Sequence, residues 1–491
     1  MKTGAKLIPF VLLICSAFLL FSNTFLSTWT YDDFKLIVNN PDIRSLDLFI
    51  KNAQPGRVGR EVSLMIDYYL FGLNPTGFHV QNILWHAVNA ILLMILVGRL
   101  GGSRFVAMVS SFLFLIHPVQ VEVVANVSHR KDSIALLFIF LSMLSYLEIF
   151  KGKYKKTYSF ALAVLFFIMA IMTKENALML PVIFIVYEAL FIADKDRFIL
   201  KYKRGLLSLI LCASILAAAY FFFFYELDRY ALTLQGHLGR QNYFAPDVFR
   251  AHYMLTLKSW SFMVMKLLLP LQLAVEYTLS VPDSWLDFWL FLTFFLLLSF
   301  LVILIKYKKR SAILTFSLLW GCLFFLPTSN ILPLSYYAAD RYLYTPSVGF
   351  CIMTGLLFDY VKFKTQYIKY GSISLLMFMM VLLTWKQNAV WRSPESLWLH
   401  SYNVTPSSTY ALNNMGIISI QKGEINKAMD FFHKSIETNP SSSTAQYNLG
   451  YLYEVAGDIE KSRQHYVNFI RLNDPDFQKE VEKVRKKLGQ R

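Results

Sequence analysis

Residues 7–41, LIPFVLLICSAFLLFSNTFLSTWTYDDFKLIVNNP, join an apolar run to a polar turn that carries two adjacent carboxylates. The apolar part, 7–26, is long enough to cross a bilayer, because a spanning helix needs about 20 mostly apolar residues. It lacks a small-x-small cleavage site, so we interpret it as an uncleaved first span. Asp32 and Asp33 then lie at the membrane boundary, where carboxylates are costly unless they are solvated, paired or functional.

The composition of the chain is typical of a membrane protein. Of its 491 residues, 56% are hydrophobic and only 16% are charged, whereas a soluble globular chain has about 25% charged residues. The net charge of +16 agrees with basic cytoplasmic loops. The sequence shows no soluble domain rich in basic and aromatic residues, so it does not predict nucleic-acid binding. The cysteines all lie in apolar segments and are interpreted as small core side chains: Cys15, Cys212, Cys322 and Cys351.

Apolar runs of spanning length recur through residues 1–385 and predict an all-α membrane bundle of about 11 spans. The predicted spans centre on 7–26, 80–97, 105–117, 134–150, 158–172, 177–192, 206–224, 285–305, 312–332, 347–361 and 372–385. The stretch 255–277 contains Lys258 and Lys266, with Pro270 near its middle. It therefore fits an interfacial or re-entrant helix better than a full span.

The distribution of basic loops sets the orientation of the predicted bundle. When 255–277 is kept at the interface, the most basic short connections, including KGKYKKTY (151–158) and KYKKR (306–310), fall on one side. Basic loops face the cytoplasm, so the N-terminus is predicted inside and the C-terminus outside. The outer side then receives the first loop, 28–79, and the polar segments 117–133, 173–176, 226–253 and 335–346.

After residue 385 the chain becomes polar and repeats itself with a period of 34 residues. Gly416 aligns with Gly450, and Phe432 aligns with Tyr466. This pattern indicates two tetratricopeptide repeats over 409–475 and a capping helix over 476–491, with 386–408 packing the array onto the membrane domain. Such arrays bind peptides or proteins on one face; a docked structural lid is the alternative.

The outer segments combine carboxylates with cations at the level of the lipid headgroups. A carboxylate can act as general base toward a hydroxyl acceptor, and Arg or Lys can stabilise the charge on a departing phosphate. This combination predicts sugar transfer from a lipid-linked phosphosugar. No metal site is predicted, because the histidines and Glu122 lack the spacing of a zinc site.

Five segments resemble the transmembrane and tetratricopeptide repeat (TMTC) proteins, which are O-mannosyltransferases of the GT-C superfamily. They are YDDFKLIVNNPDI, LFGLNPTGFHVQNILWHAVNA, HPVQVEVVANVSHRKD, TKENALMLP and NILPLSYYAADRYLYTPSVGF, in this order along the chain. The resemblance implies a GT-C bundle with a C-terminal repeat domain and an inverting transfer of mannose or another hexose. The donor would be a polyprenyl-phosphate sugar, the acceptor a hydroxyl on a protein or glycan, and no cofactor would be needed.

The resemblance also assigns roles to residues of the matched segments. Asp32 and Asp33 match the acidic motif, and either could be the base. The cations of the matched outer segments are candidates for contacts to the donor phosphate, and three further polar residues are candidates for shaping the pocket. The phosphate candidates are Arg130, Lys174 and Arg341; the pocket candidates are His117, Glu122 and Glu175.

Two departures from the family pattern bear on the acceptor and the location. Tyr31 stands where the family usually has Trp, and the repeat array is much shorter than in the eukaryotic members. The compact chain resembles a bacterial inner-membrane protein with an undecaprenyl-phosphate donor and periplasmic repeats. In a eukaryote the same chain would lie in the endoplasmic reticulum membrane, with dolichyl phosphate and lumenal repeats.

Two other function classes remain open on the sequence alone. A lipid or glycan transporter would show repeated halves and charges at mid-membrane, and the spans show neither. A membrane assembly factor without catalytic activity would depend on its repeats and tolerate Asp32→Asn and Asp33→Asn.

Overall fold

The computed structural model describes residues 4–54, 56–151, 154–193, 196–197, 246–307, 310–331, 334, 336–474 and 477–489, and every regular element among them is helical. The helices that precede the repeats are α1 (Gly4–Leu20), α2 (Leu46–Asn52), α3 (Val58–Phe71), α4 (Pro75–Arg99), α5 (Arg104–Ile116), α6 (Val121–Ala125), α7 (Arg130–Lys151), α8 (Lys156–Ile171), α9 (Leu180–Phe191), α12 (Pro246–Leu268), α13 (Phe288–Tyr307), α14 (Ala312–Phe325), α15 (Ser347–Tyr360) and α16 (Gln366–Val390). The remaining helices are α17 (Pro394–Val404), α18 (Thr409–Gln421), α19 (Ile425–Thr438), α20 (Ser443–Val455), α21 (Ile459–Leu472) and α22 (Gln478–Lys487).

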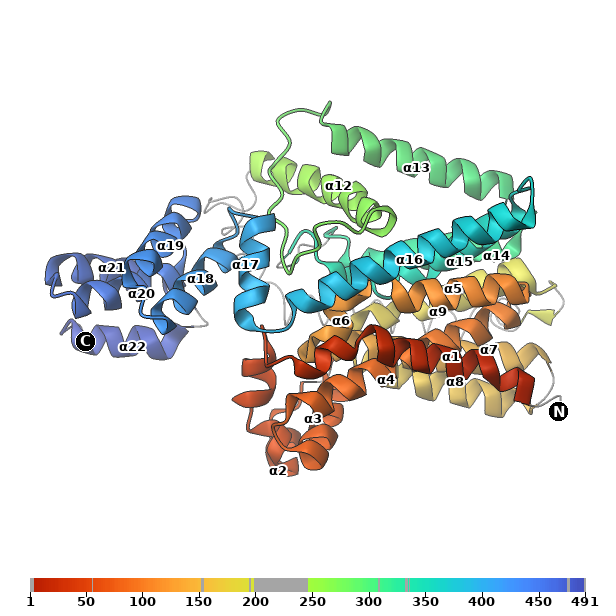
Figure 1. Ribbon diagram of the computed structural model, residues 1–491, viewed down its shortest axis with the longest axis horizontal. Helices are drawn as coiled ribbons and strands as arrows, with labels where there is room; N and C mark the ends of the chain where they lie inside the picture. Colours follow the sequence, from red (N-terminus) through yellow and green to blue (C-terminus); the bar gives the residue numbers. More distant parts are fainter. Residues whose placement is uncertain are drawn as a thin grey trace.

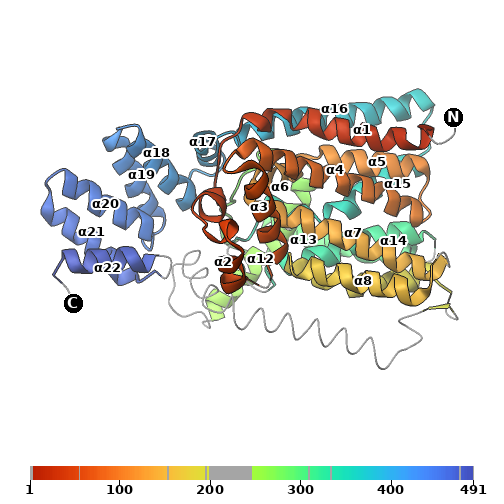
Figure 2. The same ribbon diagram turned by 90° about the horizontal axis from the view of Figure 1, so that it is seen from below.

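The long apolar helices form one elongated bundle. The N-terminus lies at one end of this bundle, and the C-terminal helices project from the opposite end (Figures 1 and 2). We call the latter the repeat end; it also carries α2, α3 and α17. The polar loop after α1 therefore lies at the same end of the molecule as the C-terminal helices.

Buried polar side chains join the central helices of the bundle. His86 of α4 bonds through its two ring nitrogens to the hydroxyl of Tyr344 at 2.9 Å and to the carbonyl oxygen of Leu115 at 3.1 Å. Asn89, one turn further along α4, donates to the carbonyl oxygen of Ser133 at 2.8 Å. Hydrogen bonds between helices hold a bundle together where lipid offers no polar alternative.

Each of the ten predicted spans in the described part of the chain contains a helix, although several helix ends differ by a few residues. Among the described residues, four helices are long and apolar enough to cross a membrane: α4, α7 (with Val127–His129), α13 and α16. The pair Arg104–Ile116 and Pro118–Ala125 would make a fifth if its 53° bend lies within one span. The apolar helices that include most or all of α1, α8, α14 and α15 are shorter than these spans. The number of spans therefore stays a prediction. The predicted span 206–224, with Cys212, and most of the predicted outer loop 226–253 lie outside the described residues.

The stretch 255–277 divides into a helix and a loop. Helix α12 ends at Leu268, before Pro270, and it is not among the helices that qualify as spans. Proline ends the helix because it has no N–H group and restricts the residue before it. The following loop reaches the repeat end, where the carbonyl oxygen of Leu273 bonds to Nε2 of His400 at 2.8 Å.

The C-terminal helices pair in the order that the 34-residue period predicts. A methyl group on Gly416 would lie 2.6 Å from the ring of Phe432, and one on Gly450 would lie 2.6 Å from the ring of Tyr466. Small residues on α18 and α20 thus let α19 and α21 approach, with an aromatic ring filling each gap. Ser408 caps α18 by accepting from the N–H of Ala411 at 3.1 Å.

Helices α14 and α15 approach so closely that a methyl group on Gly349 would lie 2.2 Å from the carbonyl oxygen of Ser317. We expect Gly349→Ala to lower the free energy of unfolding by about 1–3 kcal/mol, because backbone atoms cannot move aside as a flexible side chain can. Thermal unfolding of the purified protein in detergent measures the change. Gly321→Ala is the matched control, since its methyl group would be at an ordinary 3.5 Å from the nearest oxygen. Equal effects of the two substitutions would contradict the steric explanation.

Candidate functional site

The backbone turns sharply immediately before the two adjacent carboxylates. Tyr31 has a φ of +52°, a left-handed conformation that is uncommon for a residue other than glycine and is found where the surroundings impose it. Its ring packs 5.9 Å from that of Trp398 and 5.7 Å from that of His129. Its hydroxyl lies 3.2 Å from that of Tyr336. Contacts from three distant segments therefore hold the turn that presents Asp32.

Asp33 is fully buried, and both of its carboxylate oxygens accept backbone hydrogen bonds. Oδ2 accepts from the N–H of Thr30 at 3.1 Å, and Oδ1 accepts from the N–H of Ser128 at 2.8 Å. The second bond joins the first outer loop to the segment immediately before α7. Burial raises the pKa of Asp33 from 3.8 to about 7, although the two N–H donors and Arg130 favour the charged form.

Asp32 differs from its neighbour in both exposure and bonding. Its side chain is partly exposed, and in the described part of the chain it has no hydrogen-bond or ion-pair partner. A carboxylate with its oxygens available can accept a proton from a bound hydroxyl group. The structure therefore separates two residues that the sequence left equivalent.

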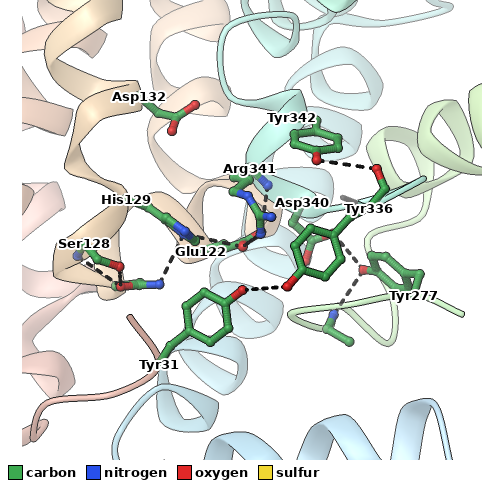
Figure 3. A network of polar contacts seen from close by, with 12 residues as sticks. Tyr31, Glu122, Ser128, His129, Asp132, Tyr277, Tyr336, Asp340, Arg341 and Tyr342 are labelled. Atoms are coloured by element: carbon green, nitrogen blue, oxygen red, sulfur yellow. Dashed lines mark hydrogen bonds and ion pairs between the residues drawn. The ribbon is translucent and has the colours of Figure 1, made fainter. Parts of the chain in front are cut away.

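A buried ion pair lies beside Tyr31 (Figure 3). Oε2 of Glu122 accepts from the N–H of Arg341 at 2.7 Å, and its Oε1 accepts from the guanidinium at 2.5 Å. Nδ1 of His129 lies 3.5 Å from the same Oε1. The guanidinium of Arg341 also stacks over the ring of Tyr336, 5.0 Å from its centre. Glu122 thus orients Arg341 next to Tyr336, whose hydroxyl contacts that of Tyr31.

Arg130 is fully buried at the start of α7, and its two terminal nitrogens donate within the protein, while its Nε has no partner among the described residues. Nη1 donates to Oδ2 of Asp67 in α3 at 2.5 Å, and Nη2 donates to the carbonyl oxygen of Phe78 in α4 at 3.1 Å. Burial raises the pKa of Asp67, while Arg130 opposes this rise. The geometry gives Arg130 a bracing role between three helices, and its predicted contact to a phosphate stays a prediction.

The remaining predicted cation, Lys174, forms an ion pair with Asp132 of α7 and is almost fully buried. Next to it in the chain, the half-buried Glu175 accepts from Arg57 of the first outer loop at 2.6 Å. Burial alone would raise the pKa of Glu175, but Arg57 and Lys174 lower it below its usual range. These pairs join the predicted outer segments 28–79, 117–133 and 173–176 at the repeat end.

His117 acts as a structural residue where α5 stops before Pro118. Its Nδ1 accepts from the N–H of Val119 at 3.4 Å, and its Nε2 lies 3.0 Å from the carbonyl oxygen of Leu267. The ring is fully buried with both nitrogens bonded. The predicted role of His117 in shaping the pocket therefore stays a prediction.

Lys131 is a further cation of these segments that the sequence analysis did not select as a candidate. It is only partly buried, it directly follows the buried Arg130, and within the described residues no hydrogen bond or ion pair occupies its ammonium group. Neighbouring helical residues point about 100° apart, so one can face the core while the next faces the site. This difference in direction between neighbouring side chains could have indicated Lys131 from the sequence, but only if the start of α7 at Arg130 had been known.

The raised pKa of Asp33 predicts a specific dependence of stability on pH. Because its folded-state pKa is about 7, above the ordinary 3.8, the stabilisation by the protonated form is complete below about pH 4 and is lost as the pH rises through 7. The wild type should therefore lose more stability between these pH values than Asp33→Asn. Unfolding in detergent at several pH values measures this. The exposed control Asp47→Asn should follow the wild type, and an identical pH profile for Asp33→Asn would contradict the assignment.

The bracing role of Arg130 predicts a pattern in single and double variants. Arg130→Met should lower stability by about 3–5 kcal/mol, because it leaves the buried Asp67 carboxylate without its partner. Arg130→Met combined with Asp67→Leu should recover much of this loss, since both charges are removed together. Thermal unfolding of the single and double variants checks this. A single variant as stable as the wild type would show that the pair does not brace the fold.

The chain is similar to known mannosyltransferases. A family model described as dolichyl-phosphate-mannose-protein mannosyltransferase matches residues 59–238. The protein O-mannosyl-transferase F38B6.6 of Caenorhabditis elegans is 24% identical over 416 residues, which cover 79% of this chain and 56% of that protein. Protein O-mannosyl-transferase TMTC4 of Mus musculus is 26% identical over 506 residues, covering 87% and 66%. Human TMTC3 is 25% identical over 456 residues, covering 84% and 49%.

The chain spans about half to two thirds of the length of these relatives. No solved structure matches it. The similarity to these relatives nevertheless extends over most of this chain. These matches agree with the predicted resemblance: along most of its length the chain is similar to protein O-mannosyl-transferases, including TMTC3 and TMTC4.

Proposed function

We propose that this protein is a membrane glycosyltransferase that moves a hexose, mannose by analogy with its relatives, from a polyprenyl phosphate to a hydroxyl group of a protein. The reaction takes place at the repeat end, on the non-cytoplasmic side of the membrane. In a bacterium this is the periplasmic face of the inner membrane, and in a eukaryote it is the lumenal face of the endoplasmic reticulum.

The observation that carries the proposal is the contrast between the two carboxylates. Asp33 is buried and bonded to two backbone N–H groups, so it fixes the loop. Asp32 is partly exposed and without a partner among the described residues, in a turn that Tyr31 holds in a left-handed conformation. A general base must be positioned yet free to meet its substrate. Asp32 fits this role and Asp33 does not.

In the proposed reaction, Asp32 accepts the proton of the acceptor hydroxyl as its oxygen bonds to the anomeric carbon. The bond between that carbon and the phosphate oxygen breaks at the same time, and the polyprenyl phosphate leaves with the electron pair. A single displacement of this kind inverts the anomeric carbon. The protein supplies proton transfer and stabilisation of the phosphate charge.

The proposed phosphate site combines cations of the segments that meet at the repeat end. Lys131 is the first candidate because its ammonium group has no partner within the described residues. Arg341, oriented by Glu122, is the second. Lys174 would contribute through its charge while it remains paired with Asp132, and Arg130 would act by holding α7 in place. Glu175 then maintains the local charge balance through Arg57.

The central test replaces Asp32 and Lys131 separately. Asp32→Asn should fold normally and lower the transfer rate about 10²–10⁴-fold, as expected for loss of a general base. Lys131→Met should weaken donor binding and raise the KM for the donor. The assay incubates purified protein with polyprenyl-phosphate mannose and a threonine-containing peptide, and measures glycopeptide by mass spectrometry.

Two outcomes would contradict the proposed function. One is wild-type protein that neither binds nor turns over any polyprenyl-phosphate hexose. The other is Asp32→Asn protein that transfers the sugar at the wild-type rate, which would show that Asp32 is not the general base. Lys434→Met removes an exposed positive charge from α19, far along the chain from the site, and it serves as the control for Lys131→Met.

A further inference from the structure

We propose that Tyr336 is a positioning residue of the candidate site: its hydroxyl holds the turn that presents Asp32, and its ring holds the guanidinium of Arg341. The inference rests on the proposed function, in which Asp32 is the general base and Arg341 contacts the donor phosphate. It extends that function by naming one side chain, itself outside the reacting groups, on which the positions of both depend.

The hydroxyl of Tyr336 constrains the acidic turn through Tyr31. The two hydroxyl oxygens lie 3.2 Å apart (Figure 3), and Tyr31 directly precedes Asp32. Burial raises the pKa of both hydroxyls above the ordinary 10, so both stay protonated at neutral pH. A left-handed backbone at a tyrosine is maintained only by its surroundings. The hydrogen bond is one of the contacts that maintain it at Tyr31, where φ is +52°.

The ring of Tyr336 constrains Arg341 from a different direction. The guanidinium carbon lies 5.0 Å from the ring centre, and the same guanidinium donates to Oε1 of Glu122 at 2.5 Å. A guanidinium is planar and presents its N–H groups in a fixed fork, so the contact with the ring and the bond to the carboxylate together limit its orientation. The hydroxyl and the ring of Tyr336 therefore have separate tasks.

Asn330 fixes the backbone of Tyr336 independently of the tyrosine side chain. Asn330 is buried and has a φ of +59°, a conformation that asparagine adopts more readily than most residues. Its Nδ2 donates to the carbonyl oxygens of Tyr336 and Tyr337, both at 3.1 Å, and its Oδ1 accepts from the N–H of Leu334 at 3.1 Å. The backbone carbonyl of Asn330 in turn accepts from Oγ1 of Thr256 in α12 at 3.1 Å. Substitutions of the Tyr336 side chain should therefore leave this loop in place.

The repeat domain contacts the Tyr336 ring as well. The ring of Tyr410, at the start of α18, has its centre 5.9 Å from that of Tyr336. The Tyr336 side chain thus lies between the acidic turn of the first outer loop and the first repeat helix, two segments from opposite parts of the chain. Packing from both segments limits the movement of the ring, as the role of a positioning residue requires.

The role of the hydroxyl is tested in the full-length protein with polyprenyl-phosphate mannose and a threonine-containing peptide. Tyr31→Phe and Tyr336→Phe should each lower kcat about five- to tenfold, as expected for loss of one hydrogen bond, and leave the KM for the donor unchanged. The double variant should lose no more than either single variant, because all three break the same bond. Tyr367→Phe is the control, since it removes a hydroxyl from a tyrosine of α16 that is 90% exposed.

The role of the ring is tested with Tyr336→Leu, which removes both the hydroxyl and the contact with Arg341. This variant should show the lowered kcat of Tyr336→Phe and, in addition, a KM for the donor that is raised about tenfold, as expected for loss of a partly buried cation–π contact. Equal KM values for the donor in Tyr336→Leu and Tyr336→Phe would contradict the role of the ring.

A third measurement needs no donor. Hydrogen exchange at residues 28–38, followed by mass spectrometry, reports how often the acidic turn opens, and it should be about five- to tenfold faster in Tyr31→Phe and Tyr336→Phe than in the wild type. An unchanged exchange rate, or additive losses of kcat in the double variant, would overturn the inference. Faster exchange in the variants, when the wild type transfers no sugar, would support the role of Tyr336 in holding the turn and contradict the proposed glycosyltransferase activity.

Discussion

The bond from the Ser128 N–H to the buried Asp33 carboxylate is the contact on which the site depends. It connects a loop after the first helix to the start of α7, 95 positions later in the chain. The same carboxylate also closes the turn at Thr30. A buried carboxylate without such donors would be strongly unfavourable, so the loop has few alternative positions. Asp32 is therefore presented by a fixed backbone although its own side chain has no partner among the described residues.

The charges around this turn are mostly compensated in pairs, which explains how so many ionisable groups are tolerated near a membrane. Arg130 pairs with Asp67, Lys174 with Asp132, and Arg341 with Glu122. Each pair joins different segments, so it braces the fold while it lowers the cost of burial. Charged side chains without a partner of opposite charge are then the ones available to a substrate. Asp32 and Lys131 are such groups within the described part of the chain.

The repeat domain is attached to the site by more than a flexible linker. Trp398 of α17 packs against Tyr31, and Tyr410 of α18 packs against Tyr336. The bond between Ser408 and the buried Glu276 adds a polar anchor at the start of the repeats. Burial raises the pKa of Glu276 to about 7, while Ser408 and Arg341 favour its charged form. The orientation of the repeat helices is thus set by the same residues that shape the site.

The sequence alone determined the helical class, the positions of the described apolar helices, the 34-residue period and the acidic turn, because these follow from local hydrophobic patterns and short motifs. It could not distinguish Asp32 from Asp33, and it could not predict that Arg130 forms an ion pair with Asp67. It also gave no reason to select Lys131. Exposure and pairing depend on contacts between segments far apart in the chain, such as Asp33 with Ser128 and Arg341 with Glu122. Only the tertiary structure decides those contacts, because burial and charge compensation arise when the helices pack together.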